Sequence, residues 1–110
     1  MKGTVKIGSI DVGMTANAAS PYFFKQIFGQ DFFRESQKDD FDPEIFQKMA
    51  FVMAMQDAKK TSEMLKLNQE AYVEWLVQFD PMDFMDASTD IATFYTAQKK
   101  TTSTPKRKGV

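Results

Sequence analysis

Apolar residues alternate with polar or small residues on both sides of a Gly-Ser pair near the start of the chain. The alternating positions are Val5 and Ile7 before Gly8-Ser9, and Ile10, Val12 and Met14 after it. A period of two around a short glycine-containing turn is typical of a β-hairpin. Because an isolated hairpin is only marginally stable in water, we expect the hairpin segment, residues 1–19, to pack on the rest of the chain.

The start of three helices is indicated by a repeated dipeptide. Three of the four prolines follow Ser or Asp, at Ser20-Pro21, Asp42-Pro43 and Asp80-Pro81. Ser or Asp can accept a hydrogen bond from a free backbone N–H at a helix start, and proline fits the first helical position because the N–H that it lacks has no partner there. We therefore expect helices to begin at these three places.

Apolar residues at helical spacing extend these starts into helices. The expected elements are a helix from Pro21 to about Phe28 that ends at Gly29, a short turn from Asp31 to Ser36, a helix from Pro43 to about Lys59, a connection from Lys60 to Leu67, a helix after Asn68, and a helix from Pro81 to about Gln98. The predicted fold is a mainly α, small helical domain of about four helices spanning residues 1–98, with a short N-terminal β-hairpin.

The helix expected over residues 43–59 is apolar on nearly all sides. One face carries Ile45, Phe46, Met49, Val52 and Met53, while Phe51 and Met55 project from the other side. Such a helix is either central in the core or presents a second apolar face to a partner. So short a chain has little material to enclose a helix completely, which favours a contact role. Phe51 and Met55 are therefore candidate partner-binding residues.

The helix after Asn68 predicts the surroundings of the single tryptophan. Tyr72, Trp75, Leu76 and Phe79 follow one another at i, i+3, i+4 and i+7. This spacing places the four side chains on one face of a helix. We expect Trp75 to be largely buried among the other three.

Charge is distributed unevenly along the chain. All fifteen acidic residues precede residue 99, together with nine of the fourteen basic ones, so residues 1–98 have a net charge of −6. The remaining basic residues are Lys99, Lys100, Lys106, Arg107 and Lys108. Residues 99–110 offer little apolar surface, so they are expected to form a disordered basic tail.

The role of this tail has three alternatives: a solubilising terminus, an arm that contacts a protein, or an arm that contacts phosphates. We include its five basic residues among the candidate partner-binding residues. An acidic domain without a basic helix argues against a nucleic-acid partner.

Composition excludes several kinds of chemistry. The chain has no histidine and no cysteine, which removes the commonest general base, the thiolate nucleophile and most ligands of zinc, copper and haem. Asp83, Asp86 and Asp90 form the only cluster that resembles a catalytic or metal constellation, and we interpret it as a solvated helix face. No nucleotide-binding or nucleophile motif is present. We expect no enzymatic activity, no cofactor and no metal site.

Apolar runs are too short for a membrane span of about 18 residues, and the N-terminus has no apolar signal core. We therefore expect an intracellular protein without a membrane partner.

The order of several segments resembles a known family. A short β-ribbon precedes Thr-Ala-Asn-Ala-Ala-Ser-Pro-Tyr-Phe-Phe-Lys-Gln-Ile-Phe-Gly-Gln-Asp-Phe at 15–32; next come Met-Ala-Phe-Val-Met-Ala at 49–54, Glu-Trp-Leu-Val-Gln-Phe-Asp at 74–80 and Lys-Lys-Thr-Thr-Ser-Thr-Pro-Lys-Arg-Lys at 99–108. The chain resembles the tail assembly chaperones of long-tailed (siphovirus-type) phages and prophages of Gram-positive bacteria. The Ala-Ser-Pro-x-x-x-x-x-x-Phe-Gly-x-Asp segment and the Thr-Thr-Ser-Thr-Pro tail contribute most, and no single segment is a strict motif.

This resemblance implies a non-enzymatic chaperone in the host bacterial cytoplasm that is absent from the mature virion. Its implied partners are the tape measure protein and, mainly through a frameshift-extended form, the tail tube protein. A homo-oligomer is a further possibility. The alternative function is a small structural virion protein, such as a tail completion or connector subunit, and a weaker alternative is a nucleic-acid-binding regulator.

Overall fold

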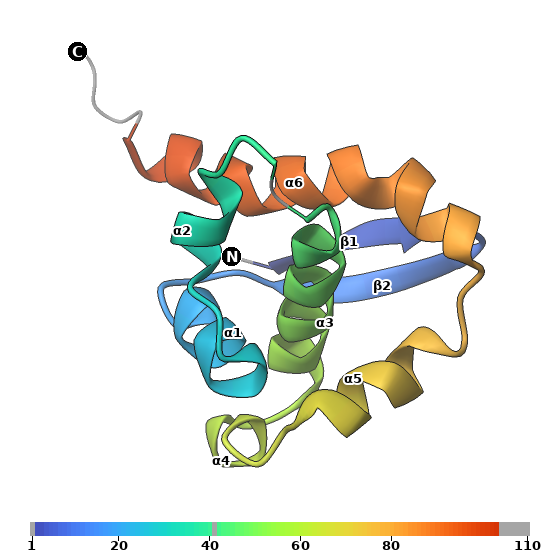
Figure 1. Ribbon diagram of the computed structural model, residues 1–110, viewed down its shortest axis with the longest axis horizontal. Coiled ribbons are helices and arrows are strands. Elements are labelled where there is room, and N and C mark those ends of the chain that lie inside the picture. The colour runs from blue at the N-terminus through green and yellow to red at the C-terminus, as the bar shows by residue number, and fades with distance from the viewer. Residues whose placement is uncertain (1, 41, 104–110) are drawn as a thin grey trace.

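The computed structural model describes residues 2–40 and 42–103, and only the backbone of residues 98–103. The described chain forms two strands and six helices (Figure 1). Their bounds are β1 Lys2–Ile7, β2 Ile10–Thr15, α1 Ser20–Phe28, α2 Phe32–Ser36, α3 Glu44–Ala58, α4 Thr61–Met64, α5 Gln69–Leu76 and α6 Pro81–Ser103. The predicted mainly α fold with an N-terminal hairpin is confirmed. The segment expected to be a connection contains one additional helical turn, α4.

Strands β1 and β2 form the predicted hairpin. They pair antiparallel, with Val5 opposite Val12 and Ile7 opposite Ile10, so Gly8 and Ser9 form a two-residue turn. Gly8 has φ +64 and Ser9 does not have a positive φ, as in a type II′ turn, which suits the twist of a hairpin. The side chains of Val5, Ile7, Val12 and Met14 are buried. The hairpin therefore has one apolar face, and this face packs on α3 and α6.

Helix α1 ends as the sequence predicts, but it begins for a different reason. It ends as predicted, because Gly29 adopts the left-handed conformation with φ +69 and its N–H donates to the Lys25 carbonyl at 2.7 Å. At its start, the expected capping role of Ser20 is wrong. The Ser20 hydroxyl is buried, accepts from the Asn17 N–H at 3.1 Å and donates to Gln56 Oε1 at 2.6 Å. It joins α1 to α3 instead of capping α1.

The two Asp-Pro pairs lie at helix starts. The Asp42 carboxylate accepts at 2.9 Å from the N–H of Glu44, the first residue of α3. Helix α6 begins at Pro81, and the N–H of Asp80 donates to Asp83 Oδ2 at 3.2 Å. Carboxylates here satisfy backbone N–H groups that have no partner within a helix.

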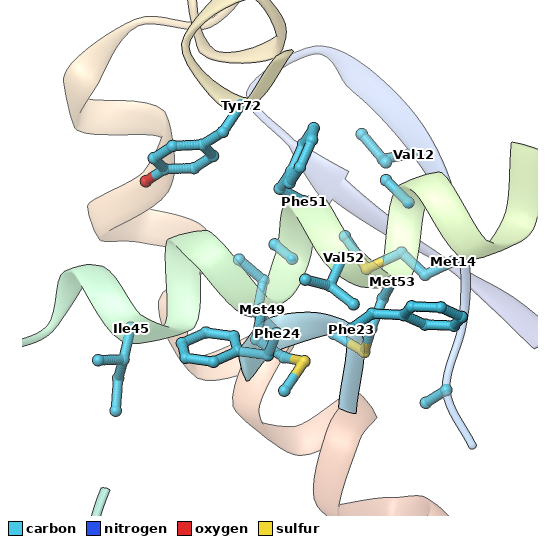
Figure 2. Packing of buried hydrophobic residues seen from close by; sticks show 14 of the residues in the cluster. Val12, Met14, Phe23, Phe24, Ile45, Met49, Phe51, Val52, Met53 and Tyr72 are labelled. Carbon is cyan, nitrogen blue, oxygen red and sulfur yellow. The ribbon is translucent and has the colours of Figure 1, made fainter. Parts of the chain in front are cut away.

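Helix α3 forms the centre of the core (Figures 1 and 2). It contacts β2 and each of the other five helices of the described chain. Its buried residues are Ile45, Met49, Ala50, Phe51, Val52, Met53 and Ala54. These residues occupy more than one side of the helix, so the apolar character on nearly all sides reflects a central core helix.

Helix α6 crosses the molecule beside the hairpin and α3 (Figure 1). Phe84, Ala87 and Ile91 are buried and form the inner stripe of α6. The helix continues to Ser103, five residues beyond the expected end at Gln98. No described helix is both long enough and sufficiently apolar to cross a membrane.

Candidate protein-binding surface

Phe51 is not available to a partner, so its predicted contact role is wrong. Its exposed fraction is 0 %. Its ring lies 5.5 Å from the ring of Tyr72, 5.6 Å from that of Trp75 and 6.3 Å from that of Phe28 (Figure 2 shows Phe51 projecting from α3 on the side of Tyr72). Helices α1 and α5 thus supply the aromatic rings that cover α3 on this side.

The remaining candidate residues lie in two places. Met55 is half-buried and packs against the core, and its contact role stays a prediction. Lys99 and Lys100 belong to α6, but their side chains lie outside the described residues. Lys106, Arg107 and Lys108 also lie outside the described part of the chain, and the role of the basic tail stays a prediction.

Other large apolar side chains are exposed. They are Ile10, Tyr22, Phe33, Leu65, Val73, Val77, Met82 and Met85. None of them was a candidate from the sequence. Met82 and Met85 lie off the inner stripe of α6. Their position in the helical pattern could have identified them as exposed residues, because an apolar residue outside a buried stripe faces solvent or a neighbouring element.

Met85 belongs to a groove between α3 and α6, which we call the α3–α6 groove. Its eight lining residues are Pro43, Glu44, Phe46 and Gln47 at the start of α3, and Phe84, Met85, Ser88 and Ile91 of α6. Its volume is about 280 Å³, at or below the ~300–1,000 Å³ typical of small-molecule pockets. The groove can therefore hold a few apolar side chains.

A hydrogen-bonded network holds the α3 side of this groove. The Tyr72 hydroxyl donates to Glu44 Oε2 at 2.8 Å and accepts from Gln47 Nε2 at 3.1 Å. Both bonds connect α5 to the first turn of α3. They fix the position of Glu44, the one charged residue among the groove-lining residues.

The surroundings of Tyr72 are apolar and negatively charged. Burial raises the pKa of Tyr72 above its usual value near 10, the hydrogen bond from Gln47 lowers it, and Glu44 and Asp42 raise it further. The carboxylates of Glu44 and Asp42 thus both act on the Tyr72 hydroxyl. They make the α3 end of the groove negatively charged.

The raised pKa of Tyr72 predicts that the folded chain loses stability at alkaline pH. A raised pKa means that the folded chain keeps the Tyr72 proton where the unfolded chain has lost it. This contribution is complete below about pH 10 and is lost as the pH rises from there through the folded-state pKa. Tyr72→Phe lacks the titrating hydroxyl. The stability gap between wild type and Tyr72→Phe, measured by urea unfolding at neutral pH and near pH 11, should therefore narrow at the higher pH. A constant gap would contradict this assignment.

The acidic cluster of α6 faces the hairpin turn. Asp83, Asp86 and Asp90 line a shallow hollow with Lys6 and Gly8. Asp86 and Asp90 are exposed, and Asp83 accepts the Asp80 N–H. No group of acidic residues in the described chain has the arrangement of a metal site. A solvated face remains our interpretation of this cluster.

Comparison of the chain with protein-family models, curated proteins and solved structures gave no match. The arguments for function therefore come from the resemblance in the sequence and from the surface geometry.

Proposed function

We propose that this protein is a non-enzymatic phage tail assembly chaperone. It binds the tape measure protein and keeps it soluble while tail tube subunits assemble around it. The tail tube protein is the second partner, mainly through a frameshift-extended form. The protein acts in the host bacterial cytoplasm and leaves the assembly before the virion is complete.

The α3–α6 groove is the structural observation that supports this proposal. A tape measure protein is largely helical, and an amphipathic helix binds other proteins by placing apolar side chains in a groove. The groove combines apolar walls from Phe46, Phe84 and Ile91 with the exposed thioether of Met85. A methionine at such a site adapts to different side chains, which suits a partner with a long and variable sequence.

Co-expression with the tape measure protein from the same gene cluster tests the proposed function. The tape measure protein alone is expected in the insoluble fraction, and in the presence of this protein it is expected in the soluble fraction and in a co-purifying complex. An unrelated acidic helical protein of similar size serves as the control. No gain in solubility and no complex would contradict the proposal.

Mass spectrometry of purified particles separates the chaperone from the alternative function, a small structural virion protein. A chaperone should be absent from particles, whereas a tail completion or connector subunit should be present at a constant copy number. Constant incorporation would favour the structural alternative.

A further inference from the structure

We propose that the α3–α6 groove selects amphipathic helices that carry basic residues beside their apolar stripe, with Met85 as its exposed anchor. This inference rests on the proposed function, because it assigns the tape measure contact to one surface. It also specifies the chemistry of the bound segment, which can be tested without the tape measure protein.

The apolar part of the groove matches one side of a helix. Phe84, Met85, Ser88 and Ile91 are at i, i+1, i+4 and i+7 of α6, so they lie along one side of that helix. Phe84 and Ile91 are almost fully buried, whereas Met85 has an exposed fraction of 67 %. A helix lying along α6 would cover Met85 and gain apolar contact without rearrangement of the core.

Charge determines which amphipathic helix fits. The groove lining contains Glu44 and no Lys or Arg. Asp39, Asp40 and Asp42 precede α3 and are exposed, while Lys38 from the same segment forms an ion pair with Glu35 at 3.2 Å. Carboxylates therefore predominate at the α3 end of the groove.

No lysine of α3 neutralises this end. Lys48 is the only basic residue of α3, and its Nζ donates to Gln30 and lies over the Phe28 ring. Basic groups on a bound helix would meet complementary charge there, and acidic groups would be repelled.

The inference is tested with two synthetic helical peptides of about 20 residues, a length above the ~12–15 residues below which isolated helices are marginal. Both have the same leucine stripe, and one carries Lys and the other Glu beside it. We expect the Lys peptide to bind at least about tenfold more tightly, with an affinity that falls as salt is added. Equal affinities for the two peptides would overturn the inference.

Met85→Gln tests the location of binding. It removes the exposed apolar anchor without adding charge and should weaken binding of the Lys peptide by about tenfold or more. Its matched control is Tyr22→Gln on α1, with a similar exposed fraction of 62 %. Helix α1 meets α3 near Gln56, toward the end of α3 opposite the groove, so Tyr22→Gln should bind like the wild type. Circular dichroism and thermal melts should show that both variants are folded.

The same variants separate this inference from the proposed function. If the tape measure protein binds wild type and Met85→Gln equally, the groove assignment is wrong and the chaperone function stands. If the Lys peptide binds through Met85 but the tape measure protein binds neither protein, the proposed function is wrong and the selectivity of the groove stands. If Met85→Gln only converts a wild-type oligomer to a monomer in sedimentation, the groove is a contact between copies and the inference is overturned.

Discussion

Phe51→Ala is expected to lower the free energy of unfolding by about 3–5 kcal/mol, the range for large-to-small changes of a buried aromatic residue. Phe51 is fully buried, and its ring meets the rings of Phe28, Tyr72 and Trp75 at centroid distances of 6.3, 5.5 and 5.6 Å, within the ~4.5–7 Å of aromatic pairs. Alanine would leave a cavity between α1, α3 and α5. Because small domains have only about 5–15 kcal/mol of stability, such a loss would remove a large part of it.

Urea unfolding followed by circular dichroism measures this effect. Phe33→Ala is the control, because Phe33 is 68 % exposed on α2 and the same substitution there should change stability by no more than about 0.5 kcal/mol. Phe51→Leu should recover part of the loss by filling much of the cavity. A loss below about 1 kcal/mol in Phe51→Ala would mean that α1 and α5 do not enclose this side of α3 in solution.

Trp75→Ala is expected to cost about 3 kcal/mol, at the lower end of the range for aromatic truncation, because Trp75 is half-buried. Its ring lies 5.0 Å from the ring of Phe79 and 5.6 Å from the rings of Phe51 and Phe84. Trp75 is predicted to be largely buried among Tyr72, Leu76 and Phe79; in the structure it is partly buried, and two of its aromatic partners come from α3 and α6. Trp75 joins three helices at the side of the core.

Fluorescence and a double-mutant cycle test this arrangement. Trp75 is the only tryptophan, so its emission reports one site, and it should shift toward that of indole in water on unfolding. Trp75 and Phe84 should show a coupling of about 0.5–1.5 kcal/mol in the cycle, as aromatic pairs in contact do. Emission already equal to that of free indole in the folded protein, or additive effects of the two substitutions, would contradict the packing of α5 on α6.

Local chemistry explains the features that could be predicted from the sequence. The Gly8-Ser9 turn, the end of α1 at Gly29 and the starts of α3 and α6 near Pro43 and Pro81 each depend on a few adjacent residues. Backbone conformation and local hydrogen bonds act over one turn, so all the residues that take part are adjacent in the sequence. These elements lie within a residue or so of their predicted positions.

Features that depend on distant elements could not be predicted in the same way. Ser20 has the sequence of a helix cap, but its hydroxyl bonds to Gln56, which is 36 positions away in the chain. The groove likewise combines the first turn of α3 with α6. Only the tertiary structure places Met85 beside the start of α3, and this position makes Met85 a candidate binding residue.

The sequence by itself determined the mainly α composition, the hairpin, the helix starts and the charge of −6 on residues 1–98. The tertiary structure decided which apolar residues are covered: Phe51 is enclosed by rings from α1 and α5, while Met85 is left at the surface. The physical reason is that helical periodicity fixes the directions of side chains around one axis, whereas burial depends on which other elements pack against each direction.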